Sequence, residues 1–94
     1  MDTSYTNGVL IKVSGKLEEY NPEAEQFNLE ELQHAVGGYI EIISINEFLV
    51  VINEDGKSKG LPYNETATKL MLGYLFNGDY IVGDALVCHQ SRID

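Results

Sequence analysis

A continuous apolar run, FLVVI at residues 48–52, constrains the fold of this chain more than any other stretch. Five apolar residues without a polar interruption are typical of a strand that is buried on both faces of a sheet. The run ends at NEDG, residues 53–56, where the Asp-Gly pair favours a turn with a positive backbone angle. A short cationic segment, residues 57–60, and then Leu61-Pro62-Tyr63 lead to Asn64, which we predict to be the N-cap of a helix. A buried strand therefore delivers many polar side chains to one end of the domain.

The helix signals in this chain are local. Asn28 and, three residues later, Glu31 form a capping box, which predicts a helix from Asn28 to the glycine pair at 37–38. A second helix is predicted from Asn64 to the Asn-Gly pair at 77–78, because apolar residues recur between them at helical spacing.

The strand signals are short apolar segments between turns. We predict strands at residues 9–13, 39–45 and 48–52, then either two short strands at 80–82 and 85–88 or one strand with a bulge. Asn46 and Glu47 leave room only for a tight hairpin, which makes the second and third strands antiparallel neighbours. Residues 16–26 have no sustained period and indicate a polar connection.

The element order β-α-β-β-α-β(β) predicts an α+β fold: a small, mostly antiparallel sheet with two helices on one face. Residues 1–94 should form a single domain, with loose ends at 1–8 and 90–94. The open edge of so small a sheet offers a route to a homodimer or a higher homo-oligomer.

Composition excludes several classes of partner. Fifteen acidic against six basic residues give a formal charge of −9, which opposes direct binding to nucleic acid or anionic lipid. No apolar run approaches the roughly 20 residues of a membrane span, and the N-terminus lacks the pattern of a secretory signal. The single cysteine, Cys88, agrees with a reducing compartment. We therefore expect a cytoplasmic protein.

Six glutamates lie within residues 18–31, which contain no lysine or arginine: Glu18, Glu19, Glu23, Glu25, Glu30 and Glu31. Such runs commonly form a solvated surface. Alternatively, they form a protein-binding surface that imitates a nucleic-acid backbone and occupies a basic cleft on another protein.

Catalytic and metal-binding patterns are sparse, and we assign no catalytic residue, metal site or cofactor. His34 and His89 are far apart in sequence, and a surface or packing role suits each better than catalysis. Cys88 and His89 are adjacent on a predicted strand, so they point to opposite faces and cannot act as a pair. There is no phosphate-binding loop, dinucleotide fingerprint or calcium loop.

Ligand binding has more support from the segment after the buried strand. Within sixteen residues it combines donors, acceptors, cations and an aromatic ring: Asn53, Glu54, Lys57, Lys59, Tyr63, Asn64, Thr66 and Thr68. The lysines suit phosphates, the tyrosine suits a base, and the helix N-terminus offers free amides to an anion. The alternative is an exposed turn that is polar only because turns are polar.

Three stretches resemble a small family of unknown function: GGYIEII (37–43), LVVINEDGKSKGLPYNETAT (49–68) and IVGDALV (81–87). Members of this family are short proteins encoded largely by phages, plasmids and the bacteria that carry them. The most specific stretch places these residues on the family pattern: Asn53, Glu54, Gly56, Lys59, Gly60, Leu61, Pro62, Asn64, Ala67 and Thr68. The resemblance covers about residues 37–88 and implies no activity. It implies a protein of mobile elements, and a pattern centred on polar loop residues suits a binding site.

Three functions remain open from the sequence. The first is a non-enzymatic counter-defence protein of a phage or mobile element, which sequesters a nucleotide-derived signal at residues 53–68. The second is an acidic inhibitor, of the anti-CRISPR or anti-restriction type, that binds a host nuclease or DNA-binding protein through the glutamates. The third is a nucleotide hydrolase, for which only Glu54, Asp55, Asp84 or a metal bound by them would activate water.

Overall fold

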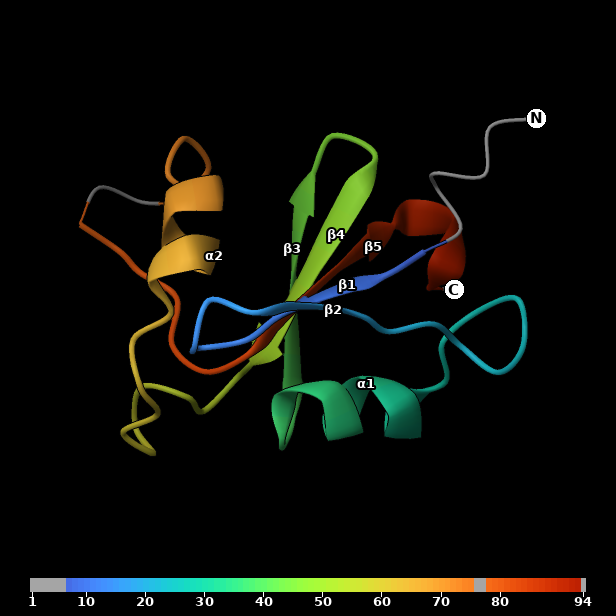
Figure 1. Cartoon of the computed structure of the whole chain (residues 1–94), viewed down its shortest axis with the longest axis horizontal. Helices are drawn as coiled ribbons and strands as arrows, with labels where there is room; N and C mark the ends of the chain where they lie inside the picture. Colours follow the sequence, from blue (N-terminus) through green and yellow to red (C-terminus); the bar gives the residue numbers. More distant parts are fainter. Residues whose placement is uncertain (1–6, 76–77, 94) are drawn as a thin grey trace.

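The computed structural model describes residues 7–75 and 78–93 (Figure 1). In this part of the chain, five strands form one antiparallel sheet in the order β2-β1-β5-β4-β3. The elements are β1 (Val9–Ile11), β2 (Leu17–Glu19), α1 (Leu29–Val36), β3 (Ile40–Ile45), β4 (Phe48–Asn53), α2 (Glu65–Leu70), β5 (Ala85–His89) and the 3-10 helix η2 (Gln90–Arg92). The predicted α+β class and antiparallel sheet are confirmed.

Helix α1 begins as its local sequence predicts. The Asn28 side chain accepts a hydrogen bond from the Glu31 amide at 2.8 Å, and the Asn28 amide donates to the Glu31 carboxylate at 2.9 Å. Gly37 ends the helix with a φ of +78°, a conformation that costs glycine little. The helix buries Leu32 and Val36 against the sheet.

The two helices cover opposite faces of the sheet, which corrects the expectation that they share one face (Figure 1). The α1 face carries the cluster that contains Val51 and Leu86, and the α2 face carries the cluster that contains Val50 and Ala85. Adjacent strand residues point to opposite sides. Because β4 is apolar on both sides, each side needs a cover, and one helix supplies each.

The hairpin between β3 and β4 has the predicted position. Asn46 supplies the positive φ of its turn, 55°, in place of the favoured glycine. The register pairs Glu41 with Ile52 and Ile43 with Val50, so these four residues lie on the same face of the sheet, the one that α2 covers.

Three segments differ from the sequence predictions. Leu17–Glu19 forms the edge strand β2 inside the expected polar connection, paired with β1. Residues 80–82 form no strand beyond a single bridge between Tyr63 and Val82, and β5 is the last strand. Helix α2 ends at Leu70, well before the stop expected at residues 77–78. Asn77 lies outside the described residues.

The chain end was expected to be loose from residue 90, yet η2 is attached to the fold. The Phe27 amide donates to the Arg92 carbonyl at 2.7 Å, and the Gln90 amide donates to the Glu47 carbonyl at 2.8 Å. These bonds join the end of the chain to the loop before α1 and to the β3–β4 turn. Residues 1–6 and 94 lie outside the described part.

No helix in residues 7–75 and 78–93 has the length and apolar character needed to cross a bilayer.

Candidate functional site

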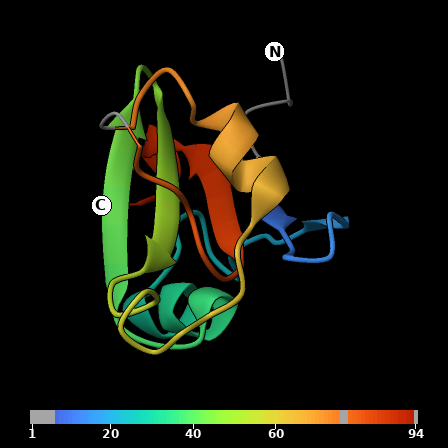
Figure 2. The same ribbon diagram turned by 90° about the vertical axis from the view of Figure 1, so that its left-hand side faces the viewer.

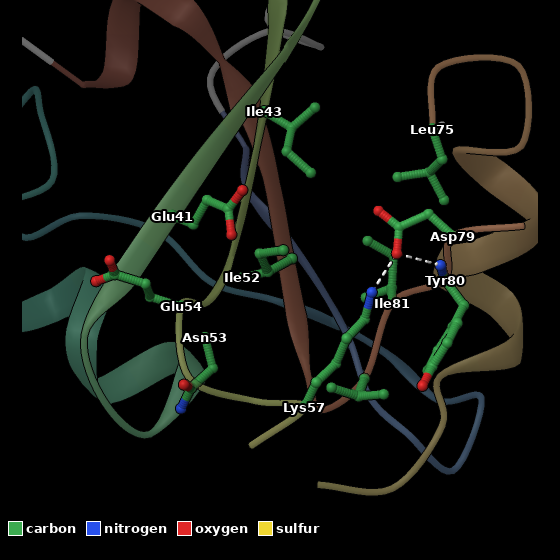
Figure 3. Close-up of a pocket in the computed structure, with 11 residues that line it drawn as sticks. Glu41, Ile43, Ile52, Asn53, Glu54, Lys57, Leu75, Asp79, Tyr80 and Ile81 are labelled. Atoms are coloured by element: carbon green, nitrogen blue, oxygen red, sulfur yellow. Dashed lines mark hydrogen bonds and ion pairs between the residues drawn. The ribbon is translucent and has the colours of Figure 1, made fainter. Parts of the chain in front are cut away.

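The predicted binding segment borders a cavity of about 120 Å³ on the α2 face of the sheet (Figure 3). Its floor and walls are apolar: Ile43, Ile52, Leu75, Ile81 and Val82. Its rim is polar or charged: Glu41, Asn53, Glu54, Lys57, Asp79 and Tyr80. The residues that line it come from strands β3 and β4 on one side and from residues 79–82 on the other. The site therefore joins segments that lie far apart in the sequence.

Backbone hydrogen bonds fix the wall formed by residues 79–82. The Asn64 amide donates to the Ile81 carbonyl at 2.9 Å, and the Ile81 amide donates to the Thr68 hydroxyl at 2.9 Å. The Gly83 amide donates to the Pro62 carbonyl at 2.8 Å. Residues 79–82 thus lie beside the start of α2, and the cavity is built into the fold before any ligand arrives.

Lys57 is the cation at the mouth of the cavity. Its ammonium forms an ion pair with Asp79 and lies 4.4 Å from the centre of the Tyr80 ring (Figure 3). The Asp79 carboxylate also accepts a hydrogen bond from the Tyr80 amide at 2.8 Å. The hydrogen bond from Lys57, and after it the one from the Tyr80 amide, lowers the pKa of Asp79. The carboxylate therefore stays ionised and holds the lysine in place.

The rim is more acidic than basic. Among the residues that line the cavity, the charge of Lys57 balances that of Asp79. The carboxylates of Glu41 and Glu54, both exposed, then give the rim an excess of negative charge. Carboxylates accept hydrogen bonds and repel anions. The mouth therefore suits ligand hydroxyl and amino groups better than a run of phosphates.

Of the eight residues proposed from the sequence, Glu54 and Lys57 present their side chains at this rim. Tyr63 is 51% exposed, and its ring meets the Tyr80 ring edge-on at 6.1 Å between centres. Lys59 is exposed and lies outside the cavity. Thr66 lines a separate apolar groove with Leu17 and Leu70.

Asn53, Asn64 and Thr68, in contrast, are buried and hydrogen-bonded to the backbone. The Asn53 side chain donates to the Val36 carbonyl at 3.1 Å and turns away from the cavity, although its strand borders it (Figure 3). Asn64 donates to the carbonyls of Ile11 and Gly83 at 2.9 and 2.8 Å. It also accepts from the Ala67 amide at 3.0 Å, which occupies one of the helix amides expected to meet an anion.

Glu41, Asp79 and Tyr80 belong to the rim but were missed in the sequence. Glu41 carried a usable signal, because it is a single charge within a strand of isoleucines and faces the same side as Ile43. Asp79 and Tyr80 had no such signal, since only the folded chain brings them beside Lys57.

The six glutamates do not share one surface. Three of them, Glu23, Glu30 and Glu31, line an open groove beside α1. The Glu31 carboxylate also accepts hydrogen bonds from the protein's own backbone amides, those of Asn28 and Glu23. On β2, Glu18 pairs in register with Leu10 and Glu19 with Val9, so these two carboxylates point to opposite faces. Glu25 lines a different hollow, beside Arg92.

Two of the groups considered for catalysis, Cys88 and Asp84, are engaged within the fold. Burial raises the pKa of the Cys88 thiol to about 11, so the thiol stays protonated. Asp84 forms an ion pair with Lys12 at 3.0 Å and accepts from the Val13 amide at 2.9 Å. Within residues 7–75 and 78–93, no three His, Cys, Asp or Glu side chains come together as metal ligands.

Comparison with known proteins gives one match. No curated protein and no solved structure is similar enough to this chain to match it. The family model described as "Domain of unknown function (DUF3846)" matches residues 7–93, which spans the whole sheet and both helices. The chain therefore belongs to the DUF3846 family.

Proposed function

We propose that the chain is a non-catalytic binding protein that captures a small molecule derived from a nucleotide. One observation carries this proposal: a preformed cavity with an apolar floor whose mouth combines Lys57, Tyr80 and two exposed carboxylates. Binding sites for small molecules are typically of this kind, mostly apolar with a few placed polar groups. Capture requires no catalytic base.

The size of the cavity limits what enters it. An enclosed apolar cavity of about 150 Å³ accommodates one benzene molecule, so an open cavity of about 120 Å³ has room for no more than a single ring, part of which would lie at the mouth. A pyrimidine-sized base, or one edge of a purine, would occupy this space. The rest of a nucleotide would then lie across the rim.

The chemistry of the rim limits the rest of the ligand. Glu41 and Glu54 would accept hydrogen bonds from ribose hydroxyls or from an exocyclic amine. Lys57 is the rim's one cation, and it would meet one phosphate while remaining close to Asp79. The proposed ligand is therefore a nucleoside derivative with few phosphate charges.

In a cell, such a protein would sequester a nucleotide-derived signal, and we propose a counter-defence role in a phage or another mobile element. The resemblance of residues 37–88 to proteins of such elements supports this setting, together with a cytoplasmic location. Capture in a host cell would act stoichiometrically, by lowering the free concentration of the signal.

Thermal unfolding with a panel of nucleosides, mononucleotides, cyclic nucleotides and ADP-ribose derivatives tests the proposal. A ligand at a hundred times its Kd should stabilise the fold by about 2.7 kcal/mol, which raises the Tm by roughly 10–20 °C in a domain of this size. Glu54→Gln and Lys57→Met should each weaken binding about tenfold.

Glu65→Gln and Lys69→Met are matched controls, because they alter an exposed ion pair of 3.1 Å that lies outside the cavity. They should leave the ligand-induced shift unchanged. A panel without any shift, or a shift that survives both cavity variants, would refute capture at this site.

A second candidate function is protein binding through the groove beside α1, and the observation in its favour is that Glu23, Glu30 and Glu31 line that groove together. The expected partner is a nuclease or other DNA-binding protein with a basic cleft. Glu23→Lys with Glu30→Lys should abolish the inhibition of such a nuclease, whereas Glu19→Lys should not, because Glu19 lies on the α2 face. Inhibition that is unchanged by salt would contradict this mechanism.

A further inference from the structure

Strand β3 is one of the two edges of the sheet, and it has the properties of a pairing surface. It is six residues long, against three for β2 at the other edge. Four of its six residues are isoleucines, with Glu41 as the single charge. Figure 2 shows β3 along the outer margin of the sheet. A long, apolar, β-branched edge strand readily pairs with another chain.

The opposite edge is protected in the usual ways. Strand β2 is short, and two of its three residues are glutamates. Glu18 also forms an ion pair with Lys16 at 3.6 Å. Short strands and charges prevent edge-to-edge pairing. Because β2 has both features and β3 has neither to that degree, the sequence restricts pairing to β3.

The direction of the backbone groups of β3 follows from its bonds to β4. The Glu54 amide donates to the Tyr39 carbonyl at 2.8 Å, so Tyr39 directs its carbonyl inward. Bonding groups alternate along an antiparallel strand. Ile40, Ile42 and Ser44 therefore direct their amides and carbonyls outward, away from β4.

We propose that two copies of the chain pair through β3, antiparallel about a two-fold axis at Ile42. A two-fold axis perpendicular to the sheet leaves the α1 face of one subunit beside the α1 face of the other. Residues directly opposite each other across the axis must therefore point to the same face. With Ile42 opposite Ile42 of the partner subunit, Ile40 lies opposite Ser44 and Glu41 lies opposite Ile43. All three outward-directed residues then form hydrogen-bonded pairs.

This register also keeps the single charge of the strand, Glu41, away from its own copy in the partner subunit. A shift that placed Glu41 opposite its own copy would bring two like charges together, which destabilises a strand pair. The register at Ile42 avoids this contact. It also covers Ile42, which is 41% exposed and lies outside both core clusters of the single chain.

The pairing joins the two cavities. Glu41 and Ile43 line the cavity of their own subunit, and in the pair each lies opposite the other across the axis. On the α2 face, the two rims therefore become neighbours in one composite site. This consequence, unlike the pairing itself, rests on the proposed function.

Cysteine crosslinking tests the register. Across the axis, Ile42→Cys should place two Cα atoms about 5.5 Å apart, whereas Ser44→Cys places its two copies about four residues apart along the strands, roughly 14 Å. Cys88 is 1% exposed and its thiol has a pKa of about 11, so the parent chain offers no competing reactive thiol. A short bis-maleimide should join Ile42→Cys into a covalent dimer at least ten times faster than Ser44→Cys. Equal rates would refute the register.

Sedimentation equilibrium tests the surface. The parent chain should be dimeric, and Ile42→Lys should weaken association at least tenfold, because the two lysines would face each other. The side chain at 42 is exposed in the single chain, so the variant should unfold at the same urea concentration at protein concentrations where both are monomeric. A monomeric parent, or a dimer lost in Leu70→Lys but kept in Ile42→Lys, would overturn the proposal. Ligand binding by a monomeric parent would leave the proposed function standing while the pairing fails.

Discussion

At the residue scale, the asparagines of this chain show why polar residues in a loop are difficult to assign from sequence. Asn53 and Asn64 appeared among candidate ligand contacts, yet both are buried and their amides hold separate parts of the backbone together. Composition indicates that a residue is polar, but only the fold shows whether its partner is a ligand or a carbonyl. Glu54 and Lys57, in contrast, lie at the cavity rim.

We predict that Asn64→Asp destabilises the fold by about 3 kcal/mol. Aspartate is as good an N-cap as asparagine, so the bond from the Ala67 amide survives. The carboxylate, however, cannot donate to the carbonyls of Ile11 and Gly83, and it would be a buried charge facing two acceptors. Urea denaturation measures the change.

Asn28→Asp is the matched control, because Asn28 is also an N-cap but is exposed, and its side chain only accepts. This variant should change stability by less than about 0.5 kcal/mol. A loss in Asn64→Asp as small as that in Asn28→Asp would mean that donation by the buried Asn64 amide adds little, and that capping is the role of Asn64.

At the element scale, short-range signals were predictive and long-range arrangement was not. Helix α1 was predicted because its capping box and its glycine stop lie within the helix itself. The faces that the helices cover depend on where each connection crosses the sheet, which no local pattern records. Strand β2 was missed because a three-residue edge strand with two glutamates buries too little to leave an alternating pattern.

The ion pair between Lys57 and Asp79 is expected to set the pKa of the Asp79 carboxyl at the cavity rim. Lys57→Met removes the main cause of the lowered pKa of Asp79, so this pKa should rise toward its ordinary value while the bond from the Tyr80 amide keeps it somewhat low. A carbon-detected NMR titration of the Asp79 carboxyl measures the change. An unaltered pKa in the variant would show that the lysine does not hold the carboxylate in solution.

The same pair sets the sign of a small pH effect on stability. Because the pKa of Asp79 is lower in the folded chain, the stabilisation is present above the ordinary pKa and is lost as the pH falls through the folded value. The Asp79 side chain is 35% exposed, so solvent limits the contribution to about 0.5 kcal/mol. Protonation of Asp79 should therefore change the free energy of unfolding only slightly.

At the scale of the whole molecule, the charge of −9 opposes any contact between two copies. The proposed β3 pairing relies on backbone hydrogen bonds and on isoleucine contacts, which salt scarcely weakens. The binding of a basic partner by the glutamates relies on attraction between opposite charges, which salt weakens. The two modes of association therefore respond to salt in opposite directions.

We predict that self-association strengthens as salt is added. Raising the ionic strength from 0.01 to 0.1 M shortens the screening length from about 30 Å to about 10 Å, which removes most of the repulsion between two chains of charge −9. Sedimentation equilibrium across this range should show the dimer Kd falling severalfold, whereas Ile42→Lys should stay monomeric throughout. A Kd that rises with salt would mean that ion pairs hold the copies together. The isoleucine edge, which offers only Glu41 as a charge, could not then be the interface.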